Sequence, residues 1–175
     1  KIREYVTVNL GTEGGGGITS VGDNCLLMIG THVAHDCFID DNVIFANHST
    51  LAGHVTVEKN VVVGALSAIH QFSRIGEGSM IGGMSGITSD VIPFTTVMGN
   101  RAKLSGLNLV GLKRNNFKKN EINELRRIFK YLFYSNEKTL EYRLNKIREE
   151  NQNYYTITKI FKFLESETRR SFCMP

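Results

Sequence analysis

The sequence predicts a left-handed parallel β-helix of hexapeptide repeats followed by a C-terminal α-helical domain, and three observations lead to this prediction. A six-residue period of apolar residues runs from residue 21 to residue 98. All 17 glycines fall between Gly11 and Gly111. Residues 1–111 carry 6 Lys/Arg against 9 Asp/Glu, whereas residues 112–175 carry 15 against 8. A boundary between two kinds of structure therefore lies near residue 105.

Two positions of each hexad define the six-residue period. The fifth position is always small or β-branched, and the first is never polar: Val21, Leu27, Val33, Ile39, Phe45, Leu51, Val57, Val63, Ile69, Ile75, Ile81, Ile87 and Pro93. Such a repeat is typical of a left-handed β-helix, in which three short strands make a triangular coil of about 18 residues. Residues one coil apart then lie one above the other, separated by about 4.8 Å.

The last third of the chain predicts three amphipathic helices. Apolar residues at three- and four-residue spacing predict the first helix within residues 120–134. The second and third are predicted by two further groups of apolar residues: Leu140, Leu144 and Ile147, then Ile157, Ile160, Phe161 and Leu164. We expect breaks at Asn120 and at Ser135–Asn136. We therefore expect two domains, a β-helix over residues 1–104 and a helical domain over residues 105–175.

Cysteine content, hydropathy and charge exclude several classes of protein. Cys25, Cys37 and Cys173 are too few for a disulfide scaffold and lack CxxC spacing, which favours a cytoplasmic location. The longest apolar run, residues 61–69, is too short to span a bilayer, and we expect no signal peptide or membrane anchor. The basic segment has no nucleic-acid-binding motif. It favours an acidic or phosphate-bearing partner, or is simply a solvated helical face.

All five histidines lie in the predicted β-helix, and none occupies a core position: His32, His35, His48, His54 and His70. Stacking of successive coils places His35, Gly53 and Gln71 in one outward column. It places Asp36, His54 and Phe72 in the next column. Because the core of the β-helix needs none of these polar side chains, their convergence predicts a functional site.

The residues of this face favour acyl transfer. Histidine suits a general base at neutral pH, which points to His35. Gly53 leaves room for close approach, and its N–H is suited to stabilising an oxyanion. Because neighbours on a strand point to opposite sides, we expect Asp36 to pair with a corner histidine or a backbone group. A zinc enzyme with three histidine ligands is a weaker alternative, since Ile75 stands where a third ligand would follow His70. A purely structural solenoid would leave the histidines unexplained.

Four segments carry a resemblance to a known family: Thr31–Cys37 (THVAHDC), Leu51–Val55 (LAGHV), Ile69–Phe72 (IHQF) and Gly111–Arg114 (GLKR). In this order and spacing they resemble the UDP-N-acetylglucosamine O-acyltransferases, which catalyse the first step of lipid A synthesis. The resemblance implies a homotrimer with active sites between subunits. It implies a (R)-3-hydroxyacyl donor on acyl carrier protein, the 3-hydroxyl of UDP-N-acetylglucosamine as acceptor, and neither a metal nor a cofactor.

The resemblance also implies roles for individual residues of the outward face. His35 matches the general base, Asp36 its orienting partner, and Gly53 the oxyanion donor. Contacts to the sugar nucleotide are implied for His32, His54, His70 and Gln71.

Further roles are implied beyond this face. Asn108 and Arg114 match groups that meet nucleotide, phosphate or carrier. Gly83, with Met80 nearby, matches the residue that measures the acyl chain. Because a glycine leaves the groove open, we expect a chain longer than about ten carbons.

Departures from the family pattern lead to further expectations. The family often has a histidine where this chain has Asn9, an acidic residue where it has Val110, and a basic residue where it has Asn115. We therefore expect its affinity for the nucleotide to differ from that of other members. The repeat already runs at Ile2, and we expect the family's upstream coils to be missing from this chain. The nearest alternative is the UDP-3-O-acylglucosamine N-acyltransferase of lipid A synthesis, which is expected to lack the His-Gln-Phe motif. A γ-type carbonic anhydrase-like metal enzyme is more remote.

Overall fold

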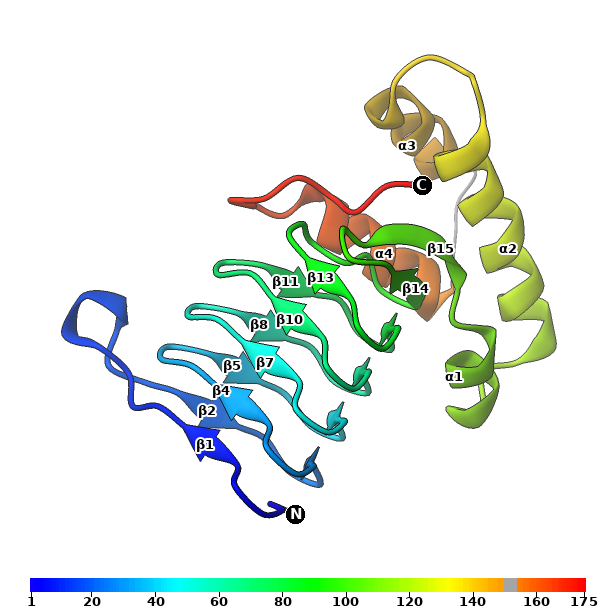
Figure 1. Ribbon diagram of the computed structural model, residues 1–175. Helices are drawn as coiled ribbons and strands as arrows, with labels where there is room; N and C mark the ends of the chain where they lie inside the picture. Colours follow the sequence, from blue (N-terminus) through cyan, green and yellow to red (C-terminus); the bar gives the residue numbers. More distant parts are fainter. Residues whose placement is uncertain (150–153) are drawn as a thin grey trace.

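The computed structural model describes residues 1–149 and 154–175 as a left-handed β-helix with α-helices beside its last coils (Figure 1). The first of three sheets contains β1 (Thr7–Val8), β4 (His32–Val33), β7 (Thr50–Leu51), β10 (Ala68–Ile69) and β13 (Gly86–Ile87). The second contains β2 (Ser20–Val21), β5 (Phe38–Ile39), β8 (Thr56–Val57) and β11 (Arg74–Ile75). The third contains β3 (Leu26–Leu27), β6 (Ile44–Phe45), β9 (Val62–Val63), β12 (Met80–Ile81), β14 (Thr95–Met98) and β15 (Lys103–Leu107).

The strand register confirms the predicted coil. His32 of β4 pairs with Thr50 of β7, which pairs with Ala68 of β10, so one turn takes 18 residues. First-position residues fill the interior, and of the predicted series from residue 21 to residue 93 Val21 alone is exposed, at 39%. Several buried fifth-position serines donate to coil carbonyls: Ser67 Oγ, for example, donates to the Gly82 oxygen at 2.9 Å, and Ser79 Oγ to the Ile92 oxygen at 2.9 Å. The hydroxyls of Thr31 and Ser73, at the same position of their hexads, have no partner among the described residues, so the backbone satisfies only part of this series.

The corners between sheets share one backbone conformation, which the hexad pattern did not reveal. The fourth position of each hexad has a positive φ near 60° at most corners. Asn and Asp adopt this left-handed conformation readily, but Leu66, Phe72 and Met84 adopt it here as well. The coil geometry therefore fixes the turn, whatever side chain the corner carries.

The helical segment contains α1 (Leu109–Arg114), α2 (Lys119–Tyr134), α3 (Leu140–Glu149) and α4 (Tyr155–Glu165). The three predicted helices are confirmed, and the short α1 was not predicted. The expected break at Asn120 is wrong, since this residue lies in the first turn of α2 and its Oδ1 accepts the N–H of Glu121. Asn is accommodated there because the first-turn amides have no partner within the helix.

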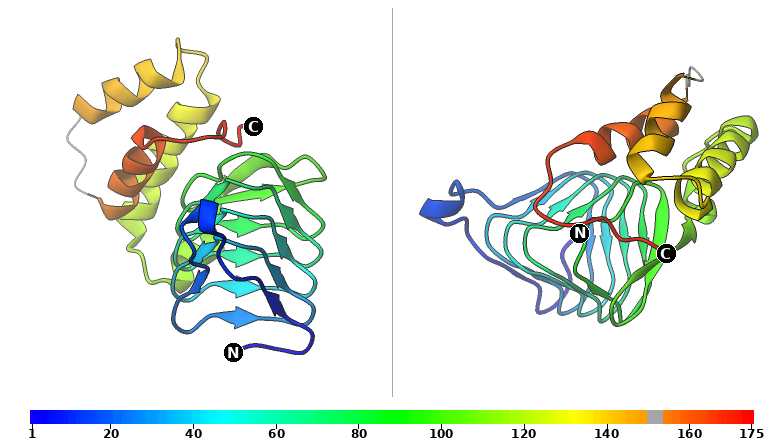
Figure 2. Two further views of the ribbon diagram at one scale, coloured as in Figure 1. Left: turned by 90° about the vertical axis from the view of Figure 1, so that its left-hand side faces the viewer. Right: turned by 90° about the horizontal axis from the view of Figure 1, so that it is seen from above.

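The two parts of the chain share one hydrophobic cluster, and the helices lie to one side of the β-helix (Figure 2). Leu104 and Leu112 lie within this cluster, together with Leu125 of α2 and Ile160 of α4. The hairpin strand β15 runs antiparallel to β14 and ends just before α1. The division at residue 104 stays a prediction. Within the described residues, no helix combines the length and the hydrophobicity that a membrane crossing needs.

The C-terminal tail returns to the last coil. The N–H of Asp90 donates to the Ser171 oxygen at 2.8 Å, and the N–H of Cys173 donates to the Asp90 oxygen at 2.8 Å. Residues 166–173 therefore lie along the corner that joins the first and second sheets (Figure 1).

Candidate active site

A hydrogen-bonded pair, His35 and Asp36, lies at the corner between β4 and β5. His35 Nδ1 is 2.8 Å from Asp36 Oδ2. We expected neighbouring side chains to point apart, and that expectation is wrong because Asp36 is not in a strand. Its φ of 57° turns the chain at the corner and brings the carboxylate under the imidazole.

Thr12 holds the Asp36 carboxylate from the other side. The Thr12 N–H donates to Oδ1 at 2.9 Å and the Thr12 hydroxyl donates to Oδ2 at 2.7 Å. The Thr12 hydroxyl, followed by the His35 hydrogen bond, lowers the pKa of Asp36 from 3.8 to about 2, although burial opposes the shift. Asp36 is 1% exposed and is a fixed anion at neutral pH.

The glycine-rich loop that carries Thr12 packs directly on Asp36. A Cβ on Gly15 would collide with the Asp36 carboxyl group, so this position requires glycine. The loop also includes the short 3₁₀ helix η1 (Glu13–Gly15). The sequence indicated only a loop at a shift of the repeat, and no pattern in it pointed to the contacts of Thr12 or Gly15.

Gly53 lies directly beneath the His35 ring, one coil further on. A Cβ at this position would lie 2.5 Å from His35 Cε1 and 2.6 Å from Nε2. Among the described residues, the Gly53 N–H has no hydrogen-bond acceptor. Gly53, whose backbone donor has no acceptor among the described residues, therefore packs against the His35 ring, which suits the stabilisation of an oxyanion formed there.

His54 completes a row of stacked rings at this corner. Its ring packs edge-on against His35, with centroids 5.1 Å apart, and stacks on Phe72 at 4.6 Å. Its Nε2 is 3.9 Å from Asp36 Oδ2. His54 is thus held by packing and faces the same carboxylate as His35.

The cluster of His35, Asp36 and His54 also bears on the zinc alternative. One possible ligand atom from each residue lies within 4.8 Å of the others. However, Asp36 Oδ2 already accepts from Thr12 and His35, and His35 Nδ1 is engaged with Asp36. Both Asp36 oxygens therefore already accept hydrogen bonds, so Asp36 acts as an acceptor for Thr12 and His35 and not as a third zinc ligand, and the cluster fits an oriented base.

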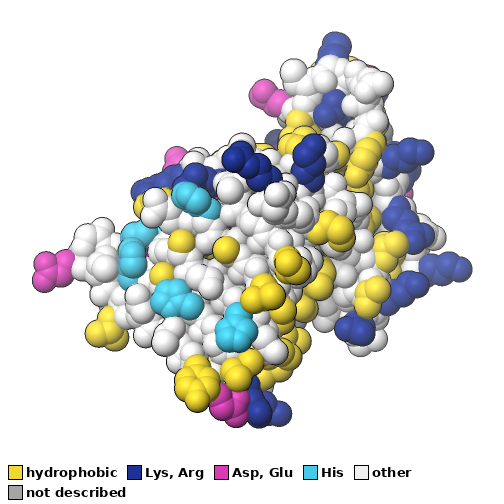
Figure 3. Space-filling view, viewed as in Figure 1, with side chains coloured by type: hydrophobic (Ala, Val, Ile, Leu, Met, Phe, Trp, Pro, Cys, Tyr) yellow, Lys and Arg dark blue, Asp and Glu magenta, His cyan; other side chains and the backbone are white. Residues whose placement is uncertain are grey.

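The other predicted sugar-nucleotide residues flank the corner. His32 lies on β4, where its Nδ1 is 2.8 Å from the Thr7 hydroxyl. His70 follows β10, and Gln71 lies one coil beyond Gly53 in the column that begins at His35. The histidine side chains gather on the β-helix face seen in Figure 3, whereas Lys and Arg side chains gather over the helices.

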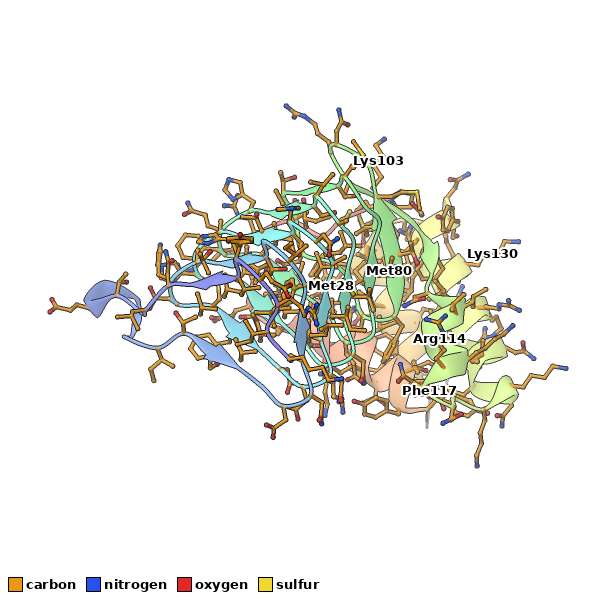
Figure 4. The ribbon with its side chains drawn as sticks, turned by 60° about the horizontal axis from the view of Figure 1, so that its bottom comes forward. Met28, Met80, Lys103, Arg114, Phe117 and Lys130 are labelled. Atoms are coloured by element: carbon orange, nitrogen blue, oxygen red, sulfur yellow. The ribbon has the colours of Figure 1, made fainter. Side chains whose placement is uncertain are left out.

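Asn108, Arg114 and Met80 lie elsewhere, at a groove of about 800 Å³ on the third sheet. Met80 projects from β12 beside Arg114 of α1 (Figure 4). The side chain of Asn108 caps α1, because its Oδ1 accepts the Gly111 N–H at 2.9 Å and its Nδ2 donates to the Gly78 oxygen at 2.9 Å. Val110 and Asn115 line the same groove.

Gly83 occupies a different corner again, between β12 and β13. A Cβ at this position would approach the Ala65 oxygen to 3.3 Å. Within one chain the predicted residues therefore form separate groups. The His35 corner and the residues flanking it form one group. The Met80 groove on the third sheet and the exposed Gly83 corner between the third and first sheets lie apart from it.

Comparison with known proteins finds relatives along the whole chain. Residues 90–173 match the family model described as UDP N-acetylglucosamine O-acyltransferase, domain 2, and residues 18–53 match the bacterial transferase hexapeptide model. The chain is 46% identical over 175 residues to an acyl-[acyl-carrier-protein]–UDP-N-acetylglucosamine O-acyltransferase of Paracoccus denitrificans. It is 49% identical over 155 residues to one of Nautilia profundicola.

This chain is matched over most of its length but spans only about two thirds, or less, of the length of each relative. All of this chain matches 66% of the Paracoccus protein, and 89% of it matches 60% of the Nautilia protein. The solved UDP-N-acetylglucosamine acyltransferase from Campylobacter jejuni superposes with a TM-score of 0.92 at 43% identity, covering 99% of this chain and 67% of that chain. Sequence, hexapeptide coils and the helical segment all agree, and the chain belongs to the UDP-N-acetylglucosamine O-acyltransferase family.

Proposed function

We propose that this chain transfers a (R)-3-hydroxyacyl group from acyl carrier protein to the 3-hydroxyl of UDP-N-acetylglucosamine, with His35 as general base. The observation that carries the proposal is the His35–Asp36 hydrogen bond at 2.8 Å, with Gly53, whose N–H has no acceptor among the described residues, packed against the His35 ring. Family membership supplies the donor and acceptor.

The geometry supports a mechanism in which His35 is held with its proton on Nδ1. Asp36 is ionised and accepts that proton in a hydrogen bond, which leaves Nε2 to receive one. Nε2 takes the proton of the acceptor hydroxyl as its oxygen attacks the thioester carbonyl. The new C–O bond forms, the carbonyl oxygen becomes an anion, and the Gly53 N–H stabilises it. When the C–S bond breaks, the proton on Nε2 passes to the departing thiol of the carrier.

The division of the predicted residues into separate groups supports a homotrimer with sites between subunits. Asn108, Arg114 and Met80 line a groove between α1 and the third sheet, whereas His35 lies at the corner between the first and second sheets, so a substrate on His35 would meet these three residues from another copy of the chain. A neighbouring copy that placed its third sheet against the first would supply them. In this arrangement His32, His54, His70 and Gln71 contact the sugar nucleotide, and Gly83 sets the acyl length at the far end.

The charge distribution supports an acidic carrier as donor. Residues 112–175 carry 15 Lys/Arg against 8 Asp/Glu, and the excess covers the helices (Figure 3). Such a surface raises the encounter rate with a protein of opposite charge. We place the reaction in the cytoplasm, where thiol carriers and the free cysteines of this chain stay reduced.

The test is acyl transfer by the full-length protein carrying His35→Ala, measured by mass spectrometry with acyl carrier protein thioesters and UDP-N-acetylglucosamine. We expect kcat/KM to fall by about 10²–10⁴, the range for a lost general base. His48→Ala is the matched control, because His48 covers Gly30 at another corner as His35 covers Gly53. Undiminished turnover of His35→Ala would remove His35 as the base. Transfer only to the amino group of an acylated glucosamine nucleotide would overturn the proposed acceptor.

A further inference from the structure

The C-terminal tail is fixed beside the candidate site by the buried carboxylate of Asp90. Its Oδ1 accepts the Arg74 N–H at 2.8 Å, and its Oδ2 accepts from Arg74 Nε at 2.7 Å and from the Thr168 hydroxyl at 2.6 Å. With the two backbone hydrogen bonds of Asp90 to Ser171 and Cys173, these contacts hold residues 168–173 against the corner. Side chains in this segment are therefore positioned by a buried anchor and not by surface contacts alone.

Arg170 reaches from this tail to the two residues that follow β10. Its Nη2 lies 2.6 Å from His70 Nδ1, and its Nε donates to the Gln71 oxygen at 3.1 Å. The neighbouring Arg169 packs over the ring of Phe72, with its guanidinium carbon 4.8 Å from the centroid. Both arginines thus contact the residues that lie one coil beyond Gly53 and His54.

The contact with His70 has one consistent arrangement of protons. A guanidinium group has only donors, so His70 Nδ1 must accept the hydrogen bond from Arg170. The Gln71 oxygen, 3.3 Å from the same Nδ1, would accept a proton from it in the other tautomer. Arg170 Nε already donates to that oxygen. The neutral ring therefore carries its proton on Nε2.

Building on the proposed function, we propose that Arg170 is a positioning residue that keeps His70 in its Nε2–H tautomer, ready to donate a hydrogen bond to an oxygen of the sugar nucleotide. Arg170 acts through His70. The tail anchored by Asp90 is then part of the binding machinery, although Arg170 is 100 residues from His70 in the sequence.

The tautomer is read directly by long-range ¹H–¹⁵N NMR of the histidine rings in the full-length protein, with His70→Ala used to assign the signal. We expect the Nε2–H pattern for His70 in the unchanged protein and in Arg170→Lys, whose ammonium still donates. We expect Arg170→Ala to shift the ring to the Nδ1–H form. An unchanged tautomer in Arg170→Ala would overturn the proposal, whether or not the protein transfers acyl groups.

Kinetics supply the second measurement. We expect Arg170→Ala to raise KM for the sugar nucleotide about five- to tenfold with little change in kcat, as for one lost hydrogen bond. In the His70→Ala background the same change should have no further effect. An equal KM increase in both backgrounds would show that Arg170 does not act through His70. Arg101→Gln, at an exposed arginine between β14 and β15, controls for the loss of one positive charge.

Discussion

Gly53→Ala tests the contact between the two central residues of the candidate site. The added Cβ would lie 2.5 Å from His35 Cε1, whereas carbon atoms in ordinary contact are about 3.5–4.0 Å apart. The imidazole must therefore move by about 1 Å. A misplacement of this size costs about 10²-fold in rate, so we expect kcat to fall by about that factor. The Gly53 N–H is retained, which means that the loss would report the position of His35.

The fold should tolerate this substitution. Gly53 does not have a positive φ, so alanine can adopt its backbone conformation. The assay is steady-state acyl transfer combined with thermal unfolding of the same samples. Gly14→Ala is the matched control, because a Cβ there meets nothing within 4 Å, and we expect its rate to stay within about twofold. A Gly53→Ala protein that is folded and within threefold of the normal kcat would refute the proposed placement of His35.

Two further predictions concern Asp36 and Gly83. Thr12→Val removes the hydroxyl that contributes most to lowering the pKa of Asp36, so this pKa should rise from about 2 toward 3.8 in a carboxyl NMR titration. Because the folded-state pKa is lowered, Asp36 stabilises the fold above about pH 4 and loses this contribution as the pH falls toward 2. Thr12→Val should therefore show a smaller loss of stability over that interval, and an unchanged titration would contradict the assignment. Gly83→Met places a long side chain on the exposed corner where the acyl groove is proposed, and we expect the preferred donor to become shorter in a mass-spectrometric competition among acyl carriers. An unchanged preference would exclude Gly83 as the residue that measures the chain.

The repeat allowed the coil, its register and its core to be predicted because these depend on period alone. First-position residues such as Ile81 are buried from Leu27 onward, and His35 must stack over Gly53 when each coil has 18 residues. The three longer helices were likewise visible in their apolar spacing. The family resemblance followed from four short segments that keep their spacing.

Other features of the candidate site depend on contacts made by segments outside the hexad repeat, which the periodicity of the sequence does not predict. Thr12 and Gly15 reach Asp36 from a loop outside the repeat, and Arg170 reaches His70 from a tail beyond the last helix. The His35–Asp36 pairing was implied by the family resemblance and not by the strand pattern, because strand alternation does not apply at a left-handed corner. The distance between Arg114 and His35 in the fold was also not evident from the sequence, since motifs give the order of residues but not the face of the molecule on which each residue lies.

The shared corner conformation has a consequence for how such a site originates. Asp36, His54 and Phe72 have φ values of 57°, 59° and 63°, so three successive coils share the same left-handed corner conformation. In this conformation the side chains of two consecutive residues, such as His35 and Asp36, can contact each other. A base and its carboxylate need no distant segment in order to meet. The solenoid thus repeats the framework of a dyad at every turn, and side-chain identity alone selects the coil that carries the chemistry.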